Sequence, residues 1–198
     1  MGEGLYIAPE HAHLASFAVA LVVLVHGLLT RARKRTIGAR IFGVIYGAWV
    51  ISMTLLPVIL GPAGEAPGLG PYWHRSVNLI PGATITLYLE SDLGRVAWAN
   101  LLGNLFLLLP FGALGPWAWR RLDSWKRVLG GGLSISIGIE LLQFARRFFD
   151  TTGFERSVDI DDVLLNTLGA LLGYALYRIG HAIVHRRGRV AHRAATKS

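Results

Sequence analysis

Five long apolar segments divide this sequence and limit what it can fold into. A helix that crosses a bilayer needs about 20 mostly apolar residues. Spanning segments must be helices or closed barrels, because lipid offers no partners for backbone N–H and C=O groups. The continuous apolar runs exclude the alternating pattern of barrel strands. The segments are residues 14–29, 41–60, 96–119, 128–149 and 160–179. The sequence therefore predicts an all-α fold, a polytopic membrane helix bundle with about five transmembrane helices.

Composition supports a membrane protein over a soluble one. Only 16% of the residues are charged, whereas soluble domains carry about 25%. A net charge of +8 in a soluble chain would suggest nucleic acid, but the basic residues here lie in short runs between apolar segments. That pattern is typical of contact with anionic lipid, so we expect membrane lipids, and no nucleic acid, as partners. The chain has no cysteine, which excludes disulfides and thiolate sites.

The distribution of charge predicts an orientation. If the N-terminus lies outside, residues 31–40, residues 120–127 and the tail from Arg178 lie inside. These three regions hold five, four and six of the 20 Lys and Arg residues, and Asp123 is the one acidic residue among them. An excess of Lys and Arg marks the cytoplasmic side. We therefore expect an outside N-terminus and a cytoplasmic C-terminus.

The ends of the chain suggest one domain with a tail. The first apolar segment follows Glu3 and Glu10 and precedes basic residues, which is the reverse of a cleaved signal peptide. It is expected to be a retained anchor. We expect residues 1–187 to form one transmembrane domain and residues 188–198 to form a basic, disordered tail.

The connection over residues 61–95 is too long for a tight hairpin. Its glycines and prolines predict an irregular start. The mixed segment 83–93 is expected to form an outer-surface or re-entrant helix, because about eleven residues cannot cross a bilayer. Tryptophans near the segment ends predict an interfacial belt. Two small-residue pairs, Gly43/Gly47 and Gly169/Gly173, predict close helix packing.

Polar residues recur at helical spacing in the last three segments. Positions separated by three or four residues share one helix face. Such sets are Asn100 and Asn104; Ser136, Glu140, Gln143 and Arg147; and Asp159, Asp162 and Asn166. Together with Arg156 in the loop before the last segment, they predict a polar pocket that opens outward and binds an amphipathic ligand.

Glu140 is the sharpest of these residues. It lies close to the middle of segment 128–149, where an ionised side chain costs roughly 2.5–3.5 kcal/mol. Pairing, protonation or a wet cavity lowers that cost, and Arg147 and Arg156 are candidate partners. Structural roles stand beside the ligand hypothesis: interhelical hydrogen bonds for the asparagines, helix N-terminal placement for the aspartates and snorkelling to headgroups for Arg146 and Arg147.

Two other functions fit the same residues. An intramembrane enzyme acting on a lipid would use Glu140 or Asp162 as general acid or base. In a variant of this idea, Asp159 and Asp162 would hold a divalent metal with phosphate oxygens, although we expect no resident metal or cofactor. A structural or assembly subunit of a membrane complex is the other alternative. The sequence has no P-loop and no internal repeat, so it does not indicate nucleotide-driven or secondary transport.

Over residues 41–180 the chain resembles the VanZ-like family of bacterial membrane proteins. The resemblance rests on Asn78-Leu-Ile-Pro81, Asn100 to Asn104, Leu109-Pro-Phe-Gly112, Ser136 with Glu140-Leu-Leu-Gln143, the run from Arg156 to Ala170, and Gly173-Tyr174. It adds Asn78 to the candidate ligand-binding residues. It implies a protein of the bacterial cell membrane and envelope. The founding member is associated with low-level teicoplanin resistance, so a lipid-linked wall precursor or a glycopeptide is the expected ligand.

Overall fold

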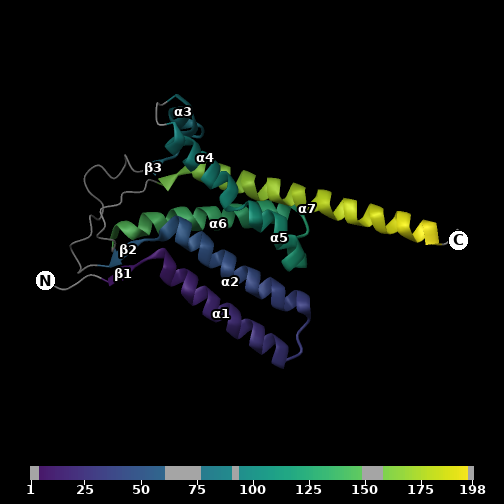
Figure 1. The fold of residues 1–198 in the computed structure, drawn as a ribbon. Coiled ribbons are helices and arrows are strands. Elements are labelled where there is room, and N and C mark those ends of the chain that lie inside the picture. The colour runs from purple at the N-terminus through teal and green to yellow at the C-terminus, as the bar shows by residue number, and fades with distance from the viewer. Residues whose placement is uncertain (1–4, 61–76, 91–93, 149–157, 196–198) are drawn as a thin grey trace.

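The computed structural model describes residues 5–60, 77–90, 94–148 and 158–195. It confirms an all-α bundle with five helical stretches long and apolar enough to cross a membrane. Figure 1 shows an elongated bundle in which α1, Pro9–Leu29, begins at one end and the last helix finishes at the other. The end that holds α3, Ala83–Glu90, and β3, Val77–Asn78, is called the α3 end below. The opposite end, which holds Arg33 and Arg120, is called the arginine end.

The first two helices form an antiparallel hairpin. They are α1, Pro9–Leu29, and α2, Lys34–Leu55. The short strands β1, Leu5–Ile7, and β2, Val58–Leu60, pair antiparallel with Leu5 opposite Leu60 and close the hairpin at the α3 end (Figure 1). Large apolar side chains on α1 are exposed, including Leu14 at 67% and Phe17 at 63%. That exposure suits a surface against lipid tails, which are as apolar as the side chains.

The third crossing is made of two helices. They are α4, Arg95–Leu107, and α5, Leu109–Ala118, with the break at Leu108. Proline has no backbone N–H and its ring clashes with the preceding turn, so it belongs at the start of a helix. Pro110 sits in the first turn of α5 and accounts for the break. After η2, a 3₁₀ turn at Arg120–Leu122, the chain enters α6, Trp125–Ala145, and a second 3₁₀ turn, η3, Arg146–Phe148.

The last helix, α7, Ile160–Ala195, is the centre of the packing and lies against α4, α5 and α6. Its glycines permit that contact. A Cβ at Gly169 would overlap the carbonyl oxygen of Leu105, and one at Gly173 would overlap that of Leu109. The predicted close packing is confirmed for this pair. A Cβ at Gly43 would instead meet the ring of Trp119, and one at Gly47 would meet no described atom within 4 Å. Among the described residues, the Gly43/Gly47 pair therefore brings no two helix backbones together. The buried core around α7 comprises Val50, Leu107, Leu108, Phe111, Val128, Ile139, Ala170 and Tyr174.

The α3 end carries the remaining elements. The predicted short helix is present as α3, Ala83–Glu90. Ahead of it, β3, Val77–Asn78, pairs in parallel with β4, Val158–Asp159, so that Asn78 lies opposite Asp159. This pairing places α3 beside the start of α7 (Figure 1). Two segments about 80 residues apart in sequence therefore meet where the polar run of the last helix begins.

Candidate functional site

Asp161 fastens α3 to the start of α7. Its side chain is fully buried, with 0% exposure. One carboxylate oxygen accepts from the backbone N–H of Gly82 at 2.6 Å, and the other accepts from those of Thr84 at 2.9 Å and Ile85 at 3.2 Å. The first N–H groups of a helix have no partner within the helix, and this carboxylate supplies one. Asp161 was not among the predicted site residues, although it lies inside the aspartate run.

Asp159 forms a second junction between the same elements. It accepts from the side-chain amide of Asn78 at 3.1 Å, from the Thr84 hydroxyl and from the backbone N–H of Asp161 at 2.9 Å. Its own backbone N–H donates to Glu140 Oε2 at 3.0 Å. Asn78, Asp159 and Glu140 therefore form one chain of hydrogen bonds that joins β3, β4 and α6. Thr84 belongs to it as well, and no spacing in the sequence indicated that.

Glu140 lies as far from the C-terminal end of its helix as from the middle of that helix. Because α6 ends at Ala145, about 7.5 Å of helix rise separates the two residues at 1.5 Å per residue. Glu140 is therefore well inside α6 and not at its terminus. Its side chain is only 3% exposed, and a buried carboxylate needs hydrogen-bond donors. The backbone N–H of Asp159 is one such donor.

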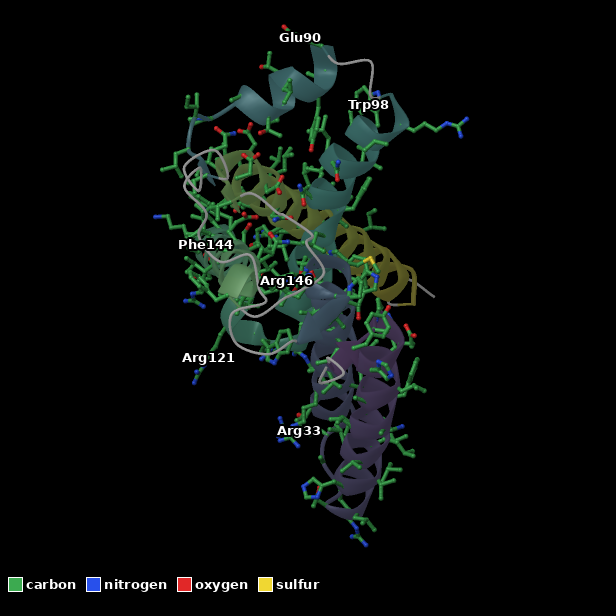
Figure 2. All side chains as sticks on the ribbon, turned by 90° about the vertical axis from the view of Figure 1, so that its left-hand side faces the viewer. Arg33, Glu90, Trp98, Arg121, Phe144 and Arg146 are labelled. Atoms are coloured by element: carbon green, nitrogen blue, oxygen red, sulfur yellow. The ribbon has the colours of Figure 1, made fainter. Side chains whose placement is uncertain are left out.

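Arg146 and Gln143 connect the end of α6 to the end of α2. Arg146 Nη2 donates to the carbonyl of Pro57 at 2.8 Å, and Gln143 Nε2 donates to that of Thr54 at 3.0 Å. Arg146 is 8% exposed and lies among other side chains in Figure 2, so the snorkelling alternative is wrong for it. Arg156 and the side chain of Arg147 lie outside the described part of the structure.

A cavity of about 290 Å³ opens among α2, α4, α6 and α7. Six predicted ligand residues line it, and their shared position is the main agreement between sequence and structure. The lining consists of Trp49, Met53 and Thr54; Ala99, Asn100, Gly103, Asn104, Phe106 and Leu107; Ile139, Glu140 and Gln143; and Asp162 and Asn166. The contribution of α2 was not predicted, because its lining residues form no polar set.

The hydrogen bonds around the cavity leave one buried acceptor open. Asn104 Nδ2 donates to Asp162 Oδ1. Asn166 Nδ2 donates to Ser136 Oγ at 2.9 Å, and Asn166 is 1% exposed. Within the described ranges, Asn166 Oδ1 has no hydrogen-bond partner. A buried acceptor without a donor costs about 1–3 kcal/mol, so Asn166 is a candidate for contact with a molecule in the cavity.

Tyr88 extends the polar groups of the cavity onto α3. Its hydroxyl accepts from Asn100 Nδ2 at 3.4 Å. Burial raises the pKa of the Tyr88 phenol, and the negative charges of Asp162 and Asp159 raise that pKa further. The phenol therefore stays neutral at physiological pH and keeps a proton to donate. Sequence spacing gave no signal for this residue.

The predicted residues thus separate into two sets. Asn100, Asn104, Glu140, Gln143, Asp162 and Asn166 line the cavity, with Ser136 bonded behind Asn166. Asn78 and Asp159 instead hold α3 and β3 in place. Among the residues that the structure describes, no three His, Cys, Asp or Glu side chains gather in a way that could hold a metal ion. Asp159 and Asp162 accept from different partners.

The five helical stretches long and apolar enough to cross a membrane define a polytopic helical membrane protein, and a cavity with polar walls lies among α2, α4, α6 and α7. The family model VanZ-LLP1, described as VanZ/LLP1, matches residues 42–181. The chain belongs to the VanZ/LLP1 family, which confirms the resemblance. The match contains every cavity residue and leaves out α1. Comparisons with curated proteins and with solved structures gave no match.

Proposed function

We propose that the protein binds an amphipathic molecule of the bacterial cell envelope, with its polar head in the cavity. The observation that carries this proposal is the set of polar groups that converge from three helices on one cavity, with Asn166 Oδ1 left without a donor among the described residues. Helix packing alone is served by hydrogen bonds that are closed on both sides. An open acceptor beside a cavity of this size fits a ligand better than it fits helix packing.

A neighbouring apolar groove fits the other half of such a molecule. It has a volume of about 410 Å³ and lies against α1, α2 and α5, with Phe17, Phe42, Ile45 and Tyr46 among its walls. Trp49 lines both the groove and the polar cavity. A ligand with its head beside Asn166 can therefore lay a hydrocarbon chain past Trp49 into the groove. That arrangement buries apolar surface of the hydrocarbon chain.

The polar groups that line the cavity limit which chemical groups the polar head of the ligand can carry. Glu140 and Asp162 are carboxyl groups, and Asn166 contributes a carbonyl oxygen. Acceptors of this kind favour a head with donors, such as sugar hydroxyls and peptide N–H groups. Both a lipid-linked wall precursor and a lipid-bearing glycopeptide carry such groups on an apolar chain. Access to them requires the cavity to face the outer leaflet, in keeping with the predicted outside N-terminus.

Filling the cavity tests the proposal without breaking a hydrogen bond. A Cβ at Gly103 has open space around it, and Gly103 lines the cavity. Gly103→Leu should abolish binding of a lipid-linked wall precursor and of teicoplanin to the purified protein in nanodiscs. Gly130→Leu is the matched control, because Gly130 also has nothing within 4 Å and lies on the exposed side of α6. Equal binding by both variants would contradict the proposal and leave the structural subunit as the better explanation.

A second variant, Glu140→Gln, distinguishes a binding protein from an enzyme. Glu140 and Asp162 both line the cavity, which is the observation that favours the alternative of an intramembrane enzyme. Glu140→Gln keeps an oxygen to accept from the Asp159 N–H and removes the acid. A binding protein should keep the ligand chemically unchanged, as followed by mass spectrometry. Turnover by the wild type that disappears in Glu140→Gln would establish the enzyme instead.

The orientation can be tested by chemical labelling. Because the sequence has no cysteine, a single introduced thiol reports its own location. Thr86 on α3 and Thr30 after α1 are both exposed. In intact cells, Thr86→Cys should react with a membrane-impermeant maleimide and Thr30→Cys should not. The reverse pattern would place the cavity at the inner leaflet and exclude a ligand taken from outside.

A further inference from the structure

A second pocket lies at the arginine end of the bundle and is separate from the cavity. Its volume is about 500 Å³. Arginines come to it from two parts of the chain, the start of α2 and the turn η2 that follows α5. The pocket arginines are Arg33, Arg35 and Arg40 from the first part and Arg120 and Arg121 from the second. Trp119, directly before Arg120 in sequence, lines the pocket as well. Figure 2 shows Arg121 extending outward from the ribbon.

The charge of this pocket is unbalanced. Of the residues that the structure describes, no aspartate or glutamate lines it, so five positive groups share one concave surface. Like charges that line one pocket repel each other. A concave surface of one sign attracts and concentrates ions of the opposite sign. The pocket therefore favours a bound anion.

The start of α2 points to the same ligand for an independent reason. α2 begins at Lys34, has no side-chain cap and has no acidic residue in its first turn. A helix N-terminus carries a partial positive charge, which basic residues there oppose rather than complement. A phosphate at that position would complement the positive end of the helix and neutralise the arginines at once. Thr36 in the first turn adds a hydroxyl to the pocket.

The pocket is built on a fixed frame. Arg35 Nε donates to the carbonyl of Trp117 at 2.7 Å, which ties the start of α2 to the end of α5. Gly38 lets the Trp117 ring approach, since a Cβ there would lie 3.1 Å from Cη2 of that ring. Trp119 packs in the same way on Gly43 and lies 6.0 Å from the ring of Phe42. The arginines thus project from two segments held in register.

The tryptophans also set the depth of the pocket. Trp117, Trp119 and Trp125 are 46%, 40% and 54% exposed. Exposed tryptophans at the ends of spanning helices lie at the level of lipid headgroups. A pocket lined by Trp119 and arginines is therefore at the depth of lipid phosphates. Basic pockets between helices on the cytoplasmic side are suited to such headgroups.

We infer that this arginine pocket binds the phosphodiester headgroup of an anionic phospholipid. Guanidinium groups bind phosphate oxygens in pairs and stay charged at all physiological pH values. The lipid would join the α1–α2 hairpin to α5 and η2 at the membrane surface. This site does not depend on the polar cavity, so either proposal can fail alone.

The test compares two variants of equal charge. Arg40→Gln with Arg120→Gln removes two pocket arginines. Lys34→Gln with Lys126→Gln removes two exposed basic residues of the same end that do not line the pocket. Native mass spectrometry follows retention of phosphatidylglycerol against phosphatidylcholine with the same chains. Two arginine contacts predict a loss of about tenfold or more in phosphatidylglycerol affinity for the first variant, and little change for the second.

Three results would overturn the inference. They are equal losses in the two variants, no preference of the wild type for phosphatidylglycerol over phosphatidylcholine, and displacement of the lipid by inorganic phosphate at millimolar concentration. The last result would mean that the pocket is a site for soluble anions. Equal thermal stability of the two variants is the control, since both replace exposed side chains.

Discussion

The two ends of the bundle use charge in opposite ways. At the α3 end the carboxylates of Asp159 and Asp161 are 5% and 0% exposed, and backbone and side-chain donors occupy their oxygens. At the arginine end five arginines are exposed on one pocket, with no described carboxylate among its walls. The first end uses charge to fix the backbone, and the second exposes charge at the surface.

This difference separates scaffold residues from candidate binding residues within one polar run. A buried charge is stable only when donors surround it, so a carboxylate whose oxygens are occupied by backbone N–H groups is part of the scaffold. Asp161 is of this kind. Asn166 differs, because its buried Oδ1 has no hydrogen-bond partner among the described residues. The comparison predicts that substitutions at the α3 end change stability first and that those at the arginine end change lipid binding first.

The largest expected effect follows loss of the Asp161 carboxylate. Asp161→Ala leaves three backbone N–H groups at the start of α3 without their acceptor, which should lower the free energy of unfolding by about 3 kcal/mol or more. Thermal unfolding in detergent measures the change. Asp123→Ala, at an exposed aspartate after η2, should shift the midpoint very little. Similar shifts in both variants would remove the distinction between the two ends.

The next effect compares two arginines. Arg146 is buried and donates to the carbonyl of Pro57, so Arg146→Gln should cost about 2 kcal/mol of stability. Arg40 is exposed, and Arg40→Gln should leave the unfolding temperature nearly unchanged. The same thermal assay reads both variants. A loss of stability in Arg40→Gln as large as that in Arg146→Gln would show that the arginine pocket is scaffold as well.

Helical spacing predicted the faces of these helices correctly where the helices are regular. Ser136, Glu140 and Gln143 were placed on one face from steps of four and three, and all three are buried. The extension of that face to Arg147 assumed a continuing α-helix. The helix changes to a 3₁₀ turn at Arg146, which has three residues per turn. That change shifts the angular positions of the residues that follow, and the side chain of Arg146 is buried.

Long-range pairing accounts for what spacing did not predict. Asp161 reaches α3 because β3 and β4 pair across about 80 residues of sequence, and no local pattern encodes that contact. Trp49 and Met53 line the cavity, yet they are ordinary residues of an apolar helix. The sequence thus predicted the bundle and most polar walls of the cavity. The wall from α2 and the role of Asp161 depend on how separate segments pack.

A smaller effect tests the open acceptor of the cavity. Asn166→Leu keeps the size of the side chain and removes its polar atoms, so affinity for a teicoplanin or wall-precursor probe should fall about tenfold, the effect of losing one buried hydrogen bond. Thr167→Val is the matched control, because the Thr167 hydroxyl is also buried and without a partner in the described structure but does not line the cavity. If the two variants bind alike, Asn166 belongs to the scaffold.

The smallest expected effect concerns Tyr88, which lies on α3 and bonds to the cavity residue Asn100. Its bond with Asn100 is long, at 3.4 Å, so Tyr88→Phe should cost about 0.5 kcal/mol of stability. Burial and the charges of Asp162 and Asp159 raise the pKa of the Tyr88 phenol. A raised pKa in the folded state means that the neutral phenol's contribution is complete below the unfolded pKa of about 10 and is lost as the pH rises through the folded value.

Stability measured from pH 7 to pH 9 should therefore show no difference in slope between the wild type and Tyr88→Phe. A difference in slope in this range would mean that the Tyr88 phenol loses its proton below pH 9 despite the neighbouring acids. Probe binding by Tyr88→Phe is measured alongside its stability. If Tyr88→Phe weakens probe binding more than it weakens the fold, α3 belongs to the binding site, and the buried aspartates that hold α3 act by positioning it.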